Sequence, residues 1–328
     1  MAGPSLHTLQ ERLVLPLIAA PMFLVSGVDL VSAACAAGVV GAFPTVNCRT
    51  SDELENWLTE IETRLAKIVE QNGDPVAPWC ANLIVHHSNA RLKDDLAVLL
   101  RHKPEIVITS VGSPAPVVEP LHDAGALVLA DVATIRHAER AVAAGADGLV
   151  LLTAGAGGQT GWLNPLAFVR AVRSFFDGPI VLAGGVSDGA ALLAAQAMGC
   201  DLAYMGTKFI ATRESLAKPA YREMLVAARA DDVLLTRAFT GLETNMLKAS
   251  IIAAGLDPDN LPARGTIDIG KDISIESREK QPTRWRDVWS AGHSVSGVDA
   301  VVSVADLVNQ TRAEYDTAKA ALVARLVK

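Results

Sequence analysis

Short apolar runs alternate with longer amphipathic segments over the first two thirds of the sequence. The short runs are rich in β-branched and aliphatic residues, as buried strands are, and the longer segments repeat apolar residues at helical spacing. Eight runs have strand length: Leu17–Ala20, Val39–Phe43, Cys80–Val85, Ile106–Thr109, Leu127–Ala130, Gly148–Leu152, Ile180–Ala183 and Leu202–Met205. Helices are predicted between them, for example over Asp52–Glu70, Asn89–Arg101, Ile135–Ala144 and Ala190–Met198.

Glycine follows several predicted helices just before the next strand, at Gly38, Gly125, Gly145 and Gly199. At these positions glycine takes up the left-handed conformation that ends a helix at little cost. Repeated strand–helix units of this kind form either a (β/α)₈ barrel or a doubly wound sheet. A dinucleotide-binding sheet would carry G-x-G-x-x-G in its first turn, which here reads Ala20-Pro21-Met22-Phe23. We therefore predict an α/β fold with a TIM (β/α)₈ barrel.

The alternation stops after Arg213, and this divides the chain into three predicted parts. Residues 1–213 form the barrel. Residues 214–288 form a small, mainly helical insertion or lid, with helices over Lys218–Ala230 and Thr244–Ala254 and a polar stretch over Asp257–Arg286. Residues 289–328 form a C-terminal segment whose helix, about Ser303–Leu326, packs back on the barrel.

Composition narrows the class of partner. Hydrophobic residues make up 50% of the 328 residues and charged residues 20%, which suits a globular chain with a large core. The formal net charge is −7, and lysine and arginine form no basic stripe, so we expect no nucleic-acid partner. An apolar helical lid is compatible with a homodimer.

The cysteines are scattered, without a C-x-x-C motif, at Cys35, Cys48, Cys80 and Cys200. This argues against a disulfide scaffold or a zinc ribbon and favours a reducing cytoplasm. The first residues lack the basic region and apolar core of a signal peptide. The uncharged stretch Leu30–Cys48 has the length of a membrane span, but Gly38, Gly41 and Pro44 interrupt it, and we interpret it as a helix followed by a buried strand.

Barrel enzymes carry their active site at the carboxyl ends of the strands, so the residues after each strand are the candidates. Gly184 and Gly185 follow the seventh strand, and Gly206 and Thr207 follow the eighth. Main-chain amides in such loops bind phosphate in many barrels, although these glycines could also serve only tight turns. The run Gly155–Gly161 after the sixth strand is bare enough to lie against a flat ligand, and Gln159 is its hydrogen-bonding side chain.

Histidines offer weaker candidates. His86 and His87 follow the third strand, where one of them could contact substrate or both could be solvated or core residues. His293 follows Trp289-Ser290-Ala291-Gly292, a run that suits a wall at the barrel mouth. We expect no metal site, because no third ligand lies near the histidine pair. The sequence contains no H-E-x-x-H, G-x-S-x-G or P-loop motif, which argues against the common zinc hydrolases, serine hydrolases and P-loop enzymes.

These motifs resemble those of the nitronate monooxygenases, formerly called 2-nitropropane dioxygenases, which are FMN-dependent barrels. The matching runs span nearly the whole chain, and the most specific is Ala211-Thr212-Arg213-Glu214 after Met205-Gly206-Thr207. The other matching runs are Leu17–Met22, Ala81–Leu83, Pro179–Gly185 with Asp188-Gly189, and Trp289–Gly292.

The resemblance implies FMN as the cofactor, with Gly184, Gly185, Gly206 and Thr207 around its phosphate. The residues expected against the isoalloxazine and ribityl groups are Ala20, Pro21, Met22 and Asn82. Asp131, Gly158, Ala183 and Met205 complete the expected cofactor-binding set. The substrates implied are a nitronate or a similar small molecule and O₂.

Two positions depart from the family pattern. Most members carry a catalytic histidine where this chain has Gln159, and some carry a basic residue where it has Asp131. Glutamine cannot accept a proton near neutral pH, so it cannot act as a general base. We therefore expect oxidation of nitronates, which are already deprotonated, but not of neutral nitroalkanes, unless His293 or His86 acts as an alternative base.

Three functions are consistent with these residues. The first is a flavin enzyme that oxidises alkyl nitronates with O₂ to a carbonyl compound and nitrite. The second is an FMN-dependent NAD(P)H reductase of the quinone or enoyl-thioester type. The third is a flavin- or phosphate-binding protein without fast turnover, or a lyase or isomerase that uses only the phosphate site.

Overall fold

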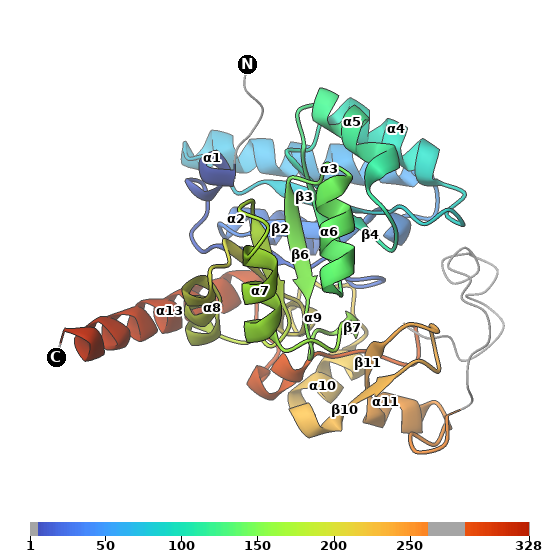
Figure 1. The fold of residues 1–328 in the computed structure, drawn as a ribbon, viewed down its shortest axis with the longest axis vertical. Helices are drawn as coiled ribbons and strands as arrows, with labels where there is room; N and C mark the ends of the chain where they lie inside the picture. The colour runs from blue at the N-terminus through green and yellow to red at the C-terminus, as the bar shows by residue number, and fades with distance from the viewer. Residues whose placement is uncertain (1–5, 262–285, 328) are drawn as a thin grey trace.

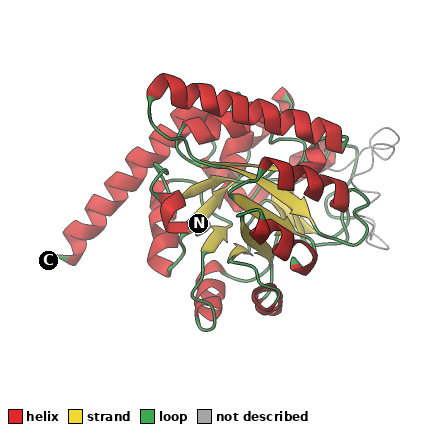
Figure 2. Cartoon of the chain, turned by 90° about the horizontal axis from the view of Figure 1, so that it is seen from above, coloured by secondary structure: helices red, strands yellow, loops and turns green. Residues whose placement is uncertain are grey.

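The computed structural model describes residues 6–261 and 286–327. Eight parallel strands close into a barrel in the order of the sequence, and helices surround it (Figures 1 and 2). These strands are β1 (Leu17–Ala19), β2 (Val40–Pro44), β3 (Trp79–Ile84), β4 (Ile106–Ser110), β5 (Leu127–Val132), β6 (Gly148–Leu152), β8 (Ile180–Ala183) and β9 (Leu202–Met205). Each predicted strand corresponds to one of them, and the predicted (β/α)₈ barrel is confirmed.

Helices connect successive strands and pack on the outside of the barrel. They are α2 (Val28–Ala36), α3 (Ser51–Asn72), α4 (Leu92–His102), α5 (Ala115–Asp123), α6 (Ile135–Ala143), α7 (Pro165–Arg173) and α8 (Gly189–Met198). Short α1 (Leu6–Gln10) closes the amino end of the barrel, because Leu9 packs into the cluster of side chains that fills the barrel interior. The carboxyl end is left as the open end.

The helix-to-strand junctions confirm the expected role of glycine. Gly38, Gly125, Gly145 and Gly199 all have φ between +83° and +102°. Two aspartates that directly precede β6 and β9 also form hydrogen bonds to the main chain of the neighbouring strands. The Asp147 carboxylate accepts a hydrogen bond from Val128 N at 2.7 Å, and Asp201 accepts one from Ile180 N at 2.8 Å. These bonds give the amino ends of β5 and β8 partners beyond the sheet ladder.

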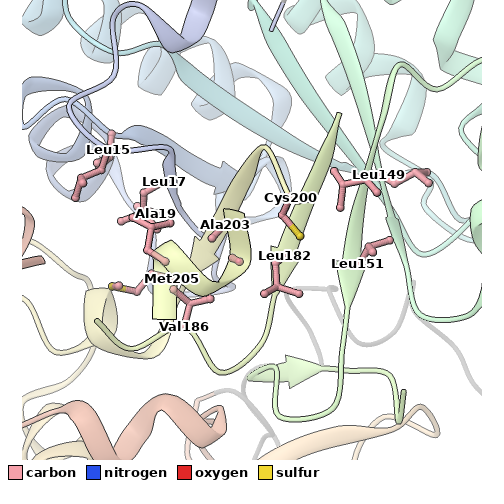
Figure 3. Close-up of a cluster of buried hydrophobic side chains, with 14 of the residues drawn as sticks. Leu15, Leu17, Ala19, Leu149, Leu151, Leu182, Val186, Cys200, Ala203 and Met205 are labelled. Atoms are coloured by element: carbon pink, nitrogen blue, oxygen red, sulfur yellow. The ribbon is translucent and has the colours of Figure 1, made fainter. Parts of the chain in front are cut away.

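Side chains alternate between the two faces of each strand. The outward set packs between the strands and the surrounding helices. Figure 3 shows part of this layer, including Leu17, Ala19, Leu149, Leu151, Ala203 and Met205. The inward set fills the barrel with Ile18, Cys80, Leu129, Val150, Val181 and Leu202. The inward-facing positions of the strands continue toward the carboxyl end of the barrel.

The chain beyond the barrel contains α9 (Thr207–Ile210), α10 (Pro219–Ala227), β10 (Val233–Thr236), β11 (Thr244–Leu247) and α11 (Lys248–Ala253). The prediction of one helix over Thr244–Ala254 is wrong in its first part. Residues 244–247 form a buried strand that pairs with β10 on one side and with β7 (Gly158–Gln159) on the other. A short apolar run is compatible with either structure, and the two partner strands decide it. Most of the predicted polar stretch Asp257–Arg286 lies outside the described residues.

The C-terminal helix α13 (Val304–Leu326) matches the prediction, and Ser303 caps it by accepting a hydrogen bond from Asp306 N at 3.1 Å. It packs across α8 at Gly189, where a Cβ atom would lie 2.0 Å from Tyr315 N. Its far end extends away from the barrel (Figure 1). None of the helices in the described part of the chain combines the length and apolar composition that crossing a membrane requires.

Candidate active site

A cavity of about 250 Å³ lies at the carboxyl ends of the barrel strands. Its floor consists of one inward-facing residue from each strand, at or near the carboxyl end of that strand. These eight residues are Ala20, Pro44, Asn82, Ser110, Asp131, Leu152, Ala183 and Tyr204. The strand period of two therefore carries the interior apolar series into a floor where four of the eight side chains are polar.

Two of the polar floor residues satisfy each other. Ser110 Oγ donates to Asn82 Oδ1 at 3.1 Å, which leaves the amide nitrogen of Asn82 available to donate into the cavity. The other two are unpartnered. Asp131 Oδ1 and Tyr204 Oη are both inaccessible to solvent, and neither has a hydrogen-bond partner among the described residues.

Asp131 is the one Asp, Glu, Lys or Arg among the described residues that line the cavity. It follows Leu129 by two positions on β5 and so points into the barrel. Its apolar surroundings disfavour the carboxylate and raise the pKa of Asp131 from 3.8 to about 7. Burial likewise raises the pKa of the neighbouring Tyr204 phenol. Burial therefore favours the protonated form of both groups.

The loop after β1 brings Ala20, Pro21 and Met22 to the cavity. Asn47, which follows β2, holds this loop with three hydrogen bonds. Its Nδ2 donates to Met22 O at 3.0 Å and to Ser26 O at 2.7 Å, and its Oδ1 accepts from Leu24 N at 2.9 Å. Leu24 has φ +59°, so the side chain of Asn47 fixes a turn that the loop's own sequence disfavours.

The turns after β8 and β9 both line the same cavity, as the sequence predicts. Gly184 has φ +127°, and a Cβ atom there would lie 2.5 Å from Thr153 Oγ1. Gly185 has φ +76°, and a Cβ atom there would have no neighbour within 4 Å. Thr207 Oγ1 accepts a hydrogen bond from Gly292 N at 3.0 Å, which leaves the hydroxyl hydrogen to donate elsewhere.

The glycine-rich loop after β6 is more tightly packed than its sequence indicates. A Cβ atom at Gly155 would lie 2.7 Å from His293 Nδ1, and one at Gly157 would lie 2.8 Å from Gly292 N. At Gly161 it would lie 2.4 Å from Leu152 O. The glycines of this loop therefore also permit close packing, and several residues of the loop line the cavity.

Gln159 lies in the cavity wall, half-buried, within β7. Its cross-strand partner is Thr244 of β11, and the adjacent Gly158 pairs with Asn245. Thr240, in the β10–β11 turn, also lines the cavity and is hydrogen-bonded to Thr244 at 2.9 Å. Gln159 thus contributes to the cavity wall from a strand that pairing with β11 holds in place.

Aromatic residues from two segments complete the wall. Tyr221 of α10 and Trp289 of the C-terminal segment both line the cavity, and their rings are stacked. Ser290 and Ala291 line it beside them, as the predicted wall over Trp289–Gly292 requires.

Not every candidate residue reaches the cavity. Met205 points outward into the core between barrel and helices (Figure 3). His293 is exposed and packs behind the loop after β6, where its main-chain N–H donates to Gly155 O at 2.9 Å. His86 interacts with Ser88 Oγ at 2.7 Å and with the ring of His87. Neither histidine, each predicted as an alternative base, is among the described residues of the cavity lining. All predicted cofactor-binding residues except Met205 line the cavity.

Several lining residues escaped the sequence analysis, among them the polar residues Ser110, Tyr204, Tyr221 and Thr240. Ser110 and Tyr204 could have been found by extending the inward alternation of their strands by one step, as for Asp131. Tyr221 and Thr240 belong to the lid, where no motif marks them. Within residues 6–261 and 286–327, no three His, Cys, Asp or Glu side chains are grouped to bind a metal ion.

The chain is an eight-stranded parallel barrel with a cavity over the carboxyl ends of its strands, lined by glycine turns and polar groups. This arrangement is typical of TIM-barrel enzymes that bind a small molecule. Comparison with known proteins narrows this class. The family model for nitronate monooxygenase matches residues 7–314. The chain belongs to the nitronate monooxygenase family and is a flavin oxidoreductase of that family.

Three relatives describe the range of the similarity. A nitronate monooxygenase from Paraburkholderia phytofirmans is 29% identical, over 91% of this chain and 92% of the relative. The (3aS,4S,5R,7aS)-5-hydroxy-7a-methyl-1-oxo-octahydro-1H-indene-4-carboxyl-CoA dehydrogenase from Rhodococcus jostii is 27% identical, over 72% of this chain and 64% of the relative. The crystal structure of nitroalkane oxidase from Streptomyces ansochromogenes is 25% identical, with a TM-score of 0.78 over 96% of this chain and 99% of that structure.

Proposed function

We propose that this chain binds FMN and oxidises alkyl nitronates with O₂ to a carbonyl compound and nitrite. The observation that carries the proposal is the convergence of the 184–185 and 206–207 turns on one cavity whose floor holds Asn82 and Ala20. Turns without side chains allow main-chain amides to approach phosphate oxygens closely. None of the described residues that line the cavity is Lys, Arg or His, so we assign the phosphate recognition to these amides and the Thr207 hydroxyl.

The open space at Gly185 supports the fit of a phosphate group. A Cβ atom would meet nothing within 4 Å there, whereas a glycine required only for packing would have close neighbours, as Gly184 does. Asn82 supplies an amide donor from the floor, and Ala20, Pro21 and Met22 supply a surface for a flat ring. Bound FMN would supply the electron transfer between substrate and O₂.

Gln159 supports the nitronate as the substrate form. The lining, as far as residues 6–261 and 286–327 form it, contains no histidine or lysine, and the amide of Gln159 cannot accept a proton near neutral pH. A nitronate needs no base, because it is already deprotonated, and the Gln159 N–H can donate to one of its charged oxygens. The neutral nitroalkane would need deprotonation first.

The test begins with the visible spectrum of the purified protein and the analysis of released cofactor. Anaerobic addition of a nitronate should then bleach the flavin, while the neutral nitroalkane at the same concentration should leave it oxidised. A protein without a riboflavin derivative contradicts the cofactor assignment. Equal rates with the two substrate forms contradict the assignment of Gln159.

Two variants sharpen this test. Gln159→His restores an ionisable side chain and should add turnover of the neutral nitroalkane. Gln159→Ala removes the amide donor while retaining the main-chain pairing with Thr244, and should slow nitronate oxidation without adding nitroalkane turnover. Loss of one such donor costs about 10²-fold or more where it stabilises developing charge.

A second candidate function is an FMN-dependent NAD(P)H reductase that acts on quinones or enoyl thioesters. The similarity to a carboxyl-CoA dehydrogenase and the largely apolar walls formed by Met22, Val46, Val111 and Ile210 favour it. Anaerobic bleaching by NADH or NADPH, with no response to nitronates, would support this function over the first.

A further inference from the structure

Two serines of the C-terminal segment line the cavity with hydroxyls that have no partner in the described part of the chain. Ser290 and Ser294, the latter in the short 3₁₀ helix η4 (His293–Gly297), are each 9% exposed, and neither Oγ atom forms a hydrogen bond with a described residue. Unlike Asp131 Oδ1 and Tyr204 Oη, neither oxygen is among the solvent-inaccessible atoms that lack a partner. A hydroxyl that is largely buried, unpaired and accessible in a cavity lining is available to a ligand.

Ser294 lies beside both of the glycine turns that we assign to the phosphate. Two positions before it, Gly292 N donates to Thr207 Oγ1 at 3.0 Å, which attaches this segment to the turn after β9. Three positions after it, a Cβ atom at Gly297 would lie 3.0 Å from Ser187 Cβ, in the loop that follows β8. These contacts on either side hold Ser294 next to the place where the two turns meet.

A phosphate group at this place depends on neutral donors. None of the described residues of the lining is Lys, Arg or His, so the described lining offers the dianion no cationic side chain. The three terminal oxygens of a phosphate are strong acceptors, and a hydrogen bond to a charged acceptor is stronger than one to a neutral acceptor. The main-chain amides of the turns and the Thr207 hydroxyl supply donors from two loops, and the Ser294 hydroxyl adds one from a third segment.

Ser290 lies at the other end of the segment, in the aromatic wall. It directly follows Trp289, and its main-chain oxygen accepts the hydrogen bond from Tyr221 Oη. Its hydroxyl therefore belongs to the part of the cavity that the aromatic rings border, and of the two serines we assign only Ser294 to the phosphate.

We propose that Ser294 donates its hydroxyl to the phosphate group of FMN, so that the segment after the lid completes the phosphate site. This inference rests on FMN being the bound group. Ser294 acts as a recognition residue for the cofactor and takes no part in electron transfer. The phosphate then joins three parts of the chain, namely the turns after β8 and β9 and the C-terminal segment.

The experiment compares FMN with riboflavin, which has the same ring and ribityl group but no phosphate. Each flavin is titrated into the deflavinated protein, and the ratio of the two dissociation constants measures the preference for FMN. Ser294→Ala should lower this preference by about tenfold to a hundredfold, the range for one hydrogen bond to a charged group. Its affinity for riboflavin should equal that of the wild type.

The thermal stability of the ligand-free protein separates this role from a structural one. Ser294→Ala removes a hydroxyl without a partner among the described residues, so the midpoint of unfolding should not fall. Ser296→Ala is the matched control, because Ser296 is exposed, lies outside the cavity lining and accepts a hydrogen bond from Ala230 N at 2.8 Å. It should lower the midpoint and leave the preference for FMN unchanged. The opposite result, a lower midpoint and an unchanged preference in Ser294→Ala, would give Ser294 a structural role and overturn the inference.

Gly185→Ala serves as the reference for the phosphate site, since its methyl group would enter the open space at that turn. If the preference for FMN falls in Gly185→Ala but not in Ser294→Ala, the inference is wrong and the proposed function stands. If Ser290→Ala loses the preference while Ser294→Ala retains it, the assignment of the two serines is wrong. A preference that none of these variants changes places the phosphate elsewhere and also overturns the inference. Absence of FMN binding by the wild type overturns the proposed function and the inference together.

Discussion

Tyr221 and Trp289 lie stacked in the cavity wall, with ring centroids 4.9 Å apart and ring planes 13° apart. Tyr221 belongs to α10 in the lid and Trp289 to the segment that returns to the barrel. Tyr221 Oη also donates to Ser290 O at 2.5 Å. The stack and the hydrogen bond together join two segments that are 68 residues apart in sequence but form one wall.

Truncation of this stack should loosen the wall. We expect Trp289→Ala to lower the free energy of unfolding by about 3–5 kcal/mol, because a largely buried aromatic side chain is removed. Tyr221→Phe retains the stack and loses the hydrogen bond, so it should cost only about 1 kcal/mol. Urea denaturation of both variants measures the difference. Equal costs would mean that the hydrogen bond, and not the stack, holds the segments together.

The two glycines after β8 should respond differently to alanine. Gly184→Ala places a methyl group 2.5 Å from Thr153 Oγ1 at φ +127°, and it should destabilise the protein by about 2–3 kcal/mol. Gly185→Ala meets no neighbour, so only its φ of +76° is unfavourable, at about 1–2 kcal/mol.

The affinity for FMN separates the roles of these glycines further. The methyl group of Gly185→Ala enters the space assigned to the phosphate, so this variant should bind FMN weakly although it remains well folded. Fluorescence titration with FMN and denaturation of the ligand-free protein measure the two quantities. Wild-type affinity in Gly185→Ala would place the phosphate elsewhere in the cavity.

Asn47, which lies outside the loop after β1, should stabilise the conformation of that loop. Asn47→Ala removes three hydrogen bonds and should lower the free energy of unfolding by about 2–3 kcal/mol, with weaker FMN binding because Ala20–Met22 lose their support. Asn47→Asp retains an acceptor for Leu24 N but no donor for the two carbonyls. It should lie between wild type and Asn47→Ala in both measurements, and a rank order with the aspartate lowest in stability would point to charge burial instead.

The stability of the ligand-free protein should depend on Asp131 with a definite sign. Its folded-state pKa is raised to about 7, so the folded state holds a proton that the unfolded state has released between about pH 4 and pH 7. This contribution to stability is complete below pH 4 and is lost as the pH rises through 7. The loss amounts to at most ~4 kcal/mol.

Denaturation of wild type and Asp131→Asn at pH 5 and pH 8 checks this sign. The wild type should lose stability relative to the asparagine variant at the higher pH. Other titrating groups are common to both proteins and cancel. A difference between the proteins that is the same at both pH values would show that the Asp131 carboxyl ionises as freely in the folded protein as in the unfolded chain.

The barrel strands were predictable because each of them is a short apolar run bounded by turn residues, and eight repeats leave few alternative folds. The left-handed glycines at positions 38, 125, 145 and 199 were predictable for the same local reason. Strand β11 was not, since Thr244–Leu247 becomes a strand only through pairing with β10 and β7.

The site was predictable to the extent that strand ends define it. The 184–185 and 206–207 turns, Asn82 and Asp131 all lie where the barrel topology places them. The glycines of the β6 loop show the limit of this reasoning, because their close neighbours Gly292 and His293 come from more than a hundred residues away. A sequence shows that a residue is small but not what presses against it.

The floor of the cavity belongs to the strands, while the Tyr221 and Thr240 part of its wall belongs to the described residues of the predicted insertion, residues 214–288. Main-chain bonds from Leu216 N to Val25 O and from Leu247 N to Trp289 O attach this stretch at both sides of the mouth. The described part of this stretch is therefore attached at two sides, and we expect substitutions in it to change which molecules enter the cavity, whereas the strands alone determine the floor.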